Sequence, residues 1–371
     1  MVELTLDENL LGMPLRKAGR PIEELREEYG LESIIRLSRN ENPLGPSPRA
    51  MEAMRTAVAD AHRYPDTCET ELRAKVAELM GPGFDEDNVI IGNGSCDVLR
   101  LVCQAFLHSG GESIICPSTF PLYRIYTEMF GGDPVLVEAK DYAYDLSAMA
   151  EKIGERTRLI FVCNPNNPTG TMLTQQQVDD FMKQVPGRVV VVFDEAYCDY
   201  VEAQDYADVR KYIKEGRSVI IARTCSKIHG LAGLRVGYGV AKKEVAEYLQ
   251  RALSPFHVGS LNLIAAAASL DDDEHIQRSR ELNAAQKRYL YEELDRLDIH
   301  YIPTECNFIL LVELGRDGEA IWEALLRRGL AVTATGGFGV PGAIRVTVGT
   351  REENERLIWA LEQVLHELAK E

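Results

Sequence analysis

A lysine beside hydroxyl side chains follows a short apolar segment, and an arginine comes soon after it. The lysine is Lys227, with Thr224 and Ser226 before it and Arg235 after it. A lysine held as a neutral amine is a nucleophile, and arginine and hydroxyl side chains commonly bind phosphate. The pattern therefore predicts a covalent amine nucleophile beside a bound phosphate group. A solvated surface residue is the alternative for a single lysine, and turn chemistry is the alternative for the hydroxyls.

A glycine-rich turn supplies a second possible phosphate contact. Residues 92–96 (GNGSC) lie between a predicted strand and a predicted helix. Glycines let the backbone approach a phosphate, and the free N–H groups at the start of a helix bind it. Many such turns bind nothing. Phosphate binding by the backbone of Ser95 and Cys96 is therefore supported only in combination with the first cluster.

Four further side chains could bind an aromatic cofactor ring. Asp194 ends the apolar segment 189–193, where a buried carboxylate needs a partner such as a pyridinium nitrogen, an ion pair or a helix cap. Tyr197 and Asn167 could both donate to a phenolate oxygen, although Asn167 also lies in a good turn sequence. Phe120 could stack on the ring, but a buried aromatic is more often part of the core.

For two further side chains, the sequence pattern does not decide between ligand binding and another role. Arg345 alternates with apolar residues, so it either faces solvent or lines a cleft, where it would bind a carboxylate through two hydrogen bonds. Tyr64 could contact a ligand or pack in the core, as Phe120 could. The lysine, the phosphate ligands and the ring partners together indicate an enzyme that uses pyridoxal phosphate.

Short apolar segments alternate with helical patterns between residues 89 and 240. This order is typical of an α/β fold, with a mostly parallel sheet covered by helices on both faces. Ligands of such sheets bind at the carboxyl ends of the strands, which is where Asp194 and Lys227 lie. The predicted strands are residues 89–91, 113–116, 134–138, 159–163, 189–193, 219–222 and 236–240.

From about residue 243 the regular alternation ends. Helices and strands in irregular order indicate a second, smaller α+β domain. We expect an N-terminal arm that joins the small domain (1–45), a large cofactor-binding domain (46–250) and a small domain (251–371). The later predicted elements are helices 244–253, 273–297, 319–328 and 352–368 and strands 308–312 and 344–348.

The composition excludes several classes of protein. The 371 residues carry a net charge of −17, which argues against binding to nucleic acid. The eight cysteines include no Cys-x-x-Cys pair, which argues against a metal site and favours a reduced, cytoplasmic protein. The first residues lack a signal-peptide pattern, and no apolar run is long enough to cross a membrane.

Eight segments spread over the chain carry motifs of one enzyme family. They are residues 37–48 (LSRNENPLGPSP), 63–66 (RYPD), 92–95 (GNGS), 166–170 (NNPTG), 194–197 (DEAY), 226–227 (SK), 232–235 (AGLR) and 345–350 (RVTVGT). The chain resembles the fold-type I aminotransferases of classes I and II, most closely the histidinol-phosphate aminotransferase branch, from about residue 21 to 368. The resemblance implies fold type I with a seven-stranded sheet in the large domain. It also implies ping-pong transfer of an amino group between an amine or amino acid and a 2-oxo acid.

The resemblance also implies a role for each site residue. Lys227 would bind the cofactor covalently and then move a proton, and Asp194 would pair with the ring nitrogen. Tyr197 and Asn167 would bind the phenolate oxygen, and Phe120 would stack on the ring. Lys227, Asp194 and Tyr197 are the expected catalytic residues. The implied phosphate ligands are Thr224, Ser226, Arg235 and the backbone of Ser95 and Cys96.

A homodimer is implied as well, because Tyr64 would reach the cofactor phosphate of a neighbouring subunit. Arg345 would bind the carboxylate of the amino acid or oxo acid. The expected substrate-binding residues are Arg345, Asn42, His229 and His257.

The chain departs from the branch near the expected substrate. Thr333 stands where the branch tends to have an arginine that helps to bind substrate anions. His229 replaces an aromatic residue, His257 stands where asparagine is common, and Cys96 begins a Cys-Asp pair in place of Asp-Glu. These departures make a changed substrate one of the possible outcomes.

Histidinol phosphate with 2-oxoglutarate, a reaction of amino-acid biosynthesis, is the single best expectation for the substrates. The alternatives are an aromatic or other amino acid, a decarboxylase or oxidase reaction on the same scaffold, and a non-catalytic cofactor-binding module of a regulator. The last is disfavoured because Lys227 is intact and the chain is acidic.

Overall fold

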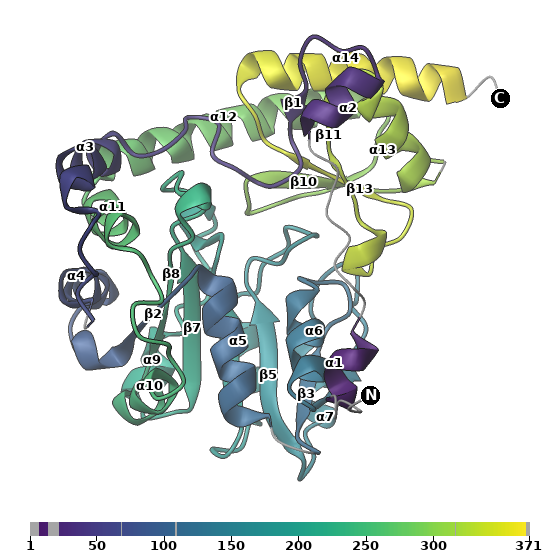
Figure 1. Cartoon of the computed structure of the whole chain (residues 1–371). Coiled ribbons are helices and arrows are strands. Elements are labelled where there is room, and N and C mark those ends of the chain that lie inside the picture. Colours follow the sequence, from purple (N-terminus) through teal and green to yellow (C-terminus); the bar gives the residue numbers. More distant parts are fainter. Residues whose placement is uncertain (1–6, 14–21, 68, 108–109, 316, 369–371) are drawn as a thin grey trace, which may run out of the picture.

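The computed structural model describes residues 7–13, 22–67, 69–107, 110–315 and 317–368. Figure 1 shows a large domain built around one sheet, with a smaller domain above it. Residues 1–6 and 14–21 of the expected arm lie outside the described residues. Within the described ranges, every helix is too short or too polar to span a membrane.

The sheet of the large domain has the strand order β2-β8-β7-β6-β5-β3-β4. β8 pairs antiparallel with both of its neighbours and the remaining pairs are parallel, so the sheet is mostly parallel, as predicted. Runs of valine and isoleucine form its centre because both faces of these strands are buried. The strands are β2 (Val89–Gly92), β3 (Glu112–Ile115), β4 (Asp133–Leu136), β5 (Thr157–Cys163), β6 (Val190–Asp194), β7 (Val219–Thr224) and β8 (Gly237–Ala241).

Amphipathic helices complete the core of this domain. One of them, α11 (Ser260–Leu270), was not predicted, and it buries Ala265 and Ala267 in the core that also contains the large sheet. We therefore propose that the domain boundary lies within α12 (Asp273–Arg296) and not at residue 251. The α-helices that precede α11 in the chain are α1 (Glu8–Gly12), α2 (Ile22–Glu28), α3 (Pro48–Ala57), α4 (Thr70–Met80), α5 (Ser95–Phe106), α6 (Leu122–Met129), α7 (Leu146–Glu151), α8 (Gln175–Met182), α9 (Arg210–Lys214) and α10 (Lys243–Gln250).

The small domain contains a four-stranded antiparallel sheet in the order β12-β13-β10-β9. α12 and α14 lie along its outer side in Figure 1. Its elements are β9 (Tyr301–Ile302), β10 (Phe308–Leu311), α13 (Gly318–Leu326), β11 (Leu330–Ala331), β12 (Thr333–Ala334), β13 (Ile344–Thr347) and α14 (Arg351–Leu368).

The end of the N-terminal arm belongs structurally to the small domain. β1 (Ile35–Arg36) pairs in parallel with β11, and Leu37 is buried in the core of the small domain. Residues 38–47 then cross to α3 of the large domain. This crossing brings the segment after β1 close to the carboxyl ends of β6 and β7.

Candidate active site

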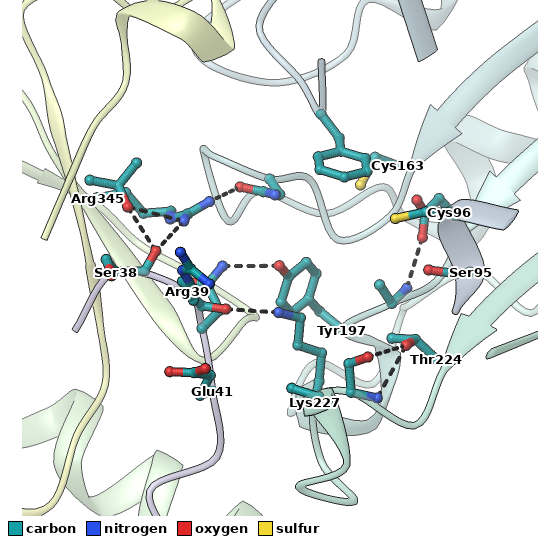
Figure 2. Close-up of a pocket in the computed structure, with 18 of the residues that line it drawn as sticks. Ser38, Arg39, Glu41, Ser95, Cys96, Cys163, Tyr197, Thr224, Lys227 and Arg345 are labelled. Atoms are coloured by element: carbon teal, nitrogen blue, oxygen red, sulfur yellow. Dashed lines mark hydrogen bonds between the residues drawn. The ribbon is translucent and has the colours of Figure 1, made fainter. Parts of the chain in front are cut away.

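A cavity of about 740 Å³ lies between the carboxyl ends of β5, β6 and β7 and the small domain. Figure 2 shows Lys227 and Tyr197 near its middle, with Ser38 and Arg345 on one side and Ser95 on the other. The structure brings most of the expected site residues together here. They are Ser95, Cys96, Phe120, Asn167, Asp194, Tyr197, Thr224, Ser226, Lys227, Arg235 and Arg345.

Lys227 lies in the turn after β7, where its ammonium group is partly buried. Nζ donates to the carbonyl oxygen of Arg39 at 2.9 Å and lies 5.5 Å from the centre of the Tyr197 ring. Burial, followed by the positive charge of Arg345, lowers the pKa of Lys227 to about 8. A substantial share of neutral amine is therefore present at a mildly alkaline pH, as a lysine nucleophile requires.

Asp194 is buried at the end of β6. Oδ2 accepts a hydrogen bond from the Tyr123 hydroxyl at 2.7 Å, and Oδ1 accepts one from the backbone N–H of Ala196 at 3.2 Å. Burial raises the pKa of Asp194 to about 6 in spite of these two donors. A positively charged ring nitrogen would supply the compensating charge that this carboxylate lacks.

Tyr197 and Asn167 are oriented so that each has a hydrogen-bond donor to spare. The Tyr197 hydroxyl accepts from Asn40 Nδ2 at 2.9 Å, so its own proton remains free, and burial raises its pKa. The amide oxygen of Asn167 accepts from Arg345, which leaves its NH₂ group as the available end. Both can donate to an oxygen atom in the cavity.

Thr224, Ser226 and Arg235 form one polar cluster, which adjoins the start of α5 at Ser95. The Thr224 hydroxyl lies 3.0 Å from the Ser226 hydroxyl, and Arg235 donates to Ser226 at 3.2 Å. Gly94 has a φ of +82°, which favours glycine, and the Arg235 guanidinium occupies the space that a Cβ at this position would take. The cluster offers hydroxyl, guanidinium and backbone donors for a phosphate.

Gly237→Ala is expected to lower the free energy of unfolding by about 1–3 kcal/mol, because a Cβ there would overlap the backbone of Gly94 and Ser95. Urea unfolding of the apoprotein measures this change. The matched control is Gly233→Ala, whose added Cβ meets no heavy atom within 4 Å. Equal stability of the two variants would contradict the close approach of β8 to the α5 turn.

Arg345 lies on β13 and is 4% exposed. Its hydrogen-bond acceptors are all neutral: the Asn167 amide oxygen, the Ser38 carbonyl at 2.7 Å and the Thr333 hydroxyl at 3.3 Å. Nε has no partner, and burial lowers the pKa of the group. A buried guanidinium without a carboxylate partner among the described residues indicates a site for an anionic ligand.

Phe120 lines the cavity, as expected for a ring-stacking residue, and packs edge-on against Tyr123 with 5.8 Å between ring centres. Tyr64 does not line it. Tyr64 is 81% exposed and stacks on Phe256 with 4.5 Å between ring centres. Its contact with a neighbouring subunit stays a prediction.

Three expected substrate-binding residues do not line the cavity, so their contact with the substrate stays a prediction. Asn42 donates to the Ile228 carbonyl at 2.7 Å, and a ring nitrogen of His229 lies 3.1 Å from the Ser269 carbonyl. Both ring nitrogens of His257 lie 3.1 Å from backbone carbonyls. Although close in sequence to site residues, these side chains are engaged in packing the surrounding segments.

Several lining residues were not predicted as site residues. They come from β1, from the segment after it and from β12, and comprise Arg36, Ser38, Arg39, Asn40, Glu41 and Thr333. Residues 37–48 were recognised as a motif, and Thr333 as a departure from the branch. Pattern alone could not show that the arm passes over the cavity.

Comparisons with known proteins are consistent with this geometry. A family model described as "Aminotransferase class I and II" matches residues 32–361. A histidinol-phosphate aminotransferase of Moorella thermoacetica is 45% identical over 94% of this chain and 89% of its own length. That of Symbiobacterium thermophilum is 42% identical over 94% of this chain and 95% of its own length.

The solved histidinol-phosphate aminotransferase of Sinorhizobium meliloti, in complex with pyridoxal-5′-phosphate, is similar in structure with a TM-score of 0.89. The match covers 98% of both chains at 24% sequence identity. At this identity it shows that the two proteins share a fold. The fold predicted from the sequence is confirmed.

Proposed function

Since this chain belongs to the class I and II aminotransferase family, we propose that it transfers an amino group from histidinol phosphate to 2-oxoglutarate with pyridoxal phosphate as its cofactor. The family expected from the sequence motifs is thereby confirmed. One observation supports the proposal most strongly. Lys227 with its lowered pKa, the buried carboxylate of Asp194 and the buried Arg345, which has no carboxylate partner among the described residues, line one cavity. Histidinol phosphate is the substrate in the names of the relatives at 42–45% identity, and 2-oxoglutarate is the acceptor expected from the sequence.

The residues of the cavity fit the cofactor. The cluster at Thr224, Ser226 and Arg235 would hold its phosphate, and Asp194 would pair with its ring nitrogen. Phe120 would cover one ring face. When bound, the cofactor supplies an electron sink that stabilises negative charge at the substrate carbon.

The protein's own residues then provide attachment, proton transfer and orientation. Lys227 Nζ would hold the cofactor and could take and return a proton at the substrate carbon. Its position beside Tyr197 and its lowered pKa suit both tasks. Asp194 stays in its charged form when its partner is positive, and the Tyr123 hydrogen bond fixes its orientation.

Arg345 would orient the substrate. Its Nε needs an acceptor, and the rings of Phe308 and Phe338 flank the guanidinium at 5.3 and 5.0 Å. An anionic substrate group would neutralise the charge and place the amino-bearing carbon next to Lys227. The same arginine could serve the carboxylate of the oxo acid in the second half-reaction, as ping-pong transfer requires.

The functional unit of the proposal is a homodimer. The exposed stacked pair Tyr64 and Phe256 is an apolar surface that a second subunit would cover. Sedimentation equilibrium of the wild-type protein and Tyr64→Ala measures the assembly. A cytoplasmic location remains a prediction from the cysteine content.

The rate at which the apoprotein captures pyridoxal phosphate is expected to rise with pH around a midpoint near 8. The sign follows from the lowered pKa: the neutral amine is populated above about pH 8, whereas an unperturbed lysine requires a pH above ~10. Stopped-flow absorbance measures the rate. Arg345→Gln should move the midpoint upward by removing a neighbouring positive charge, and a midpoint near 10 in the wild type would contradict the assignment.

The proposed reaction is tested with a panel of amino donors and 2-oxoglutarate, with glutamate as the measured product. Histidinol phosphate is expected to give the highest kcat/KM. A higher value for an aromatic or other amino acid would change the substrate but keep the reaction. Carbon dioxide or peroxide without glutamate would replace transamination with decarboxylation or oxidation.

A further inference from the structure

Three arginines line the substrate side of the cavity, and only one of them is paired with a carboxylate. Arg36 binds both carboxylate oxygens of Glu41, at 2.7 and 3.0 Å. The exposed guanidinium of Arg39 makes no hydrogen bond or ion pair with any part of the chain that the structure describes. Arg345 has only neutral acceptors. The charges of Arg36 and Glu41 cancel each other, whereas the positive charges of Arg39 and Arg345 stay uncompensated.

Thr333 cannot supply a further donor at this side of the cavity. Its hydroxyl donates to the Ser38 carbonyl at 2.7 Å and accepts from Arg345 at 3.3 Å, so its one proton is already used. The resemblance leads one to expect an arginine at this position. A phosphate monoester carries a charge between −1 and −2 at neutral pH, so it calls for a cation besides Arg345.

We infer that Arg39 is a specificity-determining residue that binds the phosphate of the amino donor together with Arg345, in place of the arginine absent at position 333. The inference rests on the proposed function. Its geometric basis is the backbone of Arg39, whose carbonyl accepts from Lys227 Nζ at 2.9 Å. The side chain therefore starts next to the reacting lysine and lines the same cavity as Arg345.

Figure 2 supports this arrangement. Arg39 and Arg345 lie on the same side of the cavity, across from Ser95 and Cys96. The cofactor-phosphate cluster and the unpaired arginines thus occupy opposite sides, with Lys227 between them. Two anionic groups, one on the cofactor and one on the substrate, can then be bound at the same time without repelling each other at close range.

The test compares Arg39→Gln with Arg327→Gln, using the holoenzyme with histidinol phosphate and with histidinol, which lacks the phosphate. Arg39→Gln is expected to raise KM for histidinol phosphate roughly 10- to 100-fold, the effect of one charge-assisted hydrogen bond, with kcat little changed. KM for histidinol should stay the same. Arg327→Gln, whose exposed side chain pairs with Glu323 and does not line the cavity, should change neither KM by more than about threefold.

A second variant separates anion binding from a structural effect. In the Arg39→Gln background, Thr333→Arg restores a cation to this side of the cavity and should recover most of the lost affinity for histidinol phosphate. Arg39→Lys should recover part of it, because lysine keeps the charge but loses the planar pair of donors. An equal rise in KM for both donors, or no rise at all, overturns the inference.

The inference can fail separately from the proposed function. If the wild-type enzyme does not use histidinol phosphate, the proposed substrate is wrong, and inorganic phosphate then serves as the probe. At constant ionic strength, phosphate should raise the thermal unfolding midpoint of the wild-type and Arg327→Gln holoenzymes but not that of Arg39→Gln. The absence of a phosphate effect in the wild type, or an equal effect in Arg39→Gln, overturns the anion site.

Discussion

Replacing Lys227 with alanine is expected to lower kcat by at least about 10⁴-fold and to abolish the visible absorbance of the lysine-bound cofactor. The substitution removes the only amine that the described residues place in the cavity, one that lies beside Tyr197 and has a lowered pKa. Both attachment and proton transfer depend on that nitrogen. Single-turnover kinetics with the purified variant, saturated with pyridoxal phosphate, measures the loss.

Lys227→Arg is the informative companion variant. Arginine keeps the positive charge but does not lose its proton, so it should be about as inactive as alanine. The exposed Lys152 provides a matched control, since Lys152→Ala should leave kcat unchanged. Activity of Lys227→Arg within tenfold of the wild type would show that charge, not a neutral amine, is what the site needs.

Asp194→Asn is expected to lower kcat on the order of 10²- to 10³-fold, because an amide cannot stabilise a positive ring nitrogen as a carboxylate does. The variant should still bind the cofactor, since the phosphate cluster at Thr224, Ser226 and Arg235 is untouched. Steady-state kinetics and cofactor titration separate the two effects. A wild-type kcat would contradict the assigned pairing.

The same variant should stabilise the apoprotein. The pKa of Asp194 is raised by burial to about 6, so the folded state binds more protons than the unfolded state between about pH 4 and 6. Wild-type stability therefore falls as the pH rises through this window. At pH 7.5 the asparagine variant should gain about 2 kcal/mol, measured by apoprotein unfolding, and should gain little at pH 4. A lower stability of apo Asp194→Asn at pH 7.5 would show that burial does not penalise this carboxylate.

The cofactor side of the cavity was largely predictable from the sequence. Strand-ending residues such as Asp194 and Thr224 must meet at one edge of a parallel sheet, whatever the details of the loops. Lys227 comes three residues after Thr224, so its place was determined as well. Most of the seven strands were found because strands that are buried on both faces are continuous runs of apolar residues, and only β4 is not buried in this way.

The substrate side was less predictable because it depends on contacts between distant segments. Arg39 reaches the cavity only because β1 pairs with β11 and residues 38–47 then cross to the large domain. His229 and His257 were expected there from their sequence neighbours, but local sequence does not fix which way a side chain points. α11 was missed because its small residues give a weak amphipathic pattern, although they pack closely in the core.

A single-turnover experiment tests the central claim most directly. Holoenzyme is mixed with histidinol phosphate without any oxo acid, and 2-oxoglutarate is added afterwards. The proposed function predicts loss of the lysine-bound cofactor absorbance in the first step, followed by its return with one glutamate formed per active site. An unchanged spectrum after histidinol phosphate, or a spectrum restored without glutamate, would contradict it.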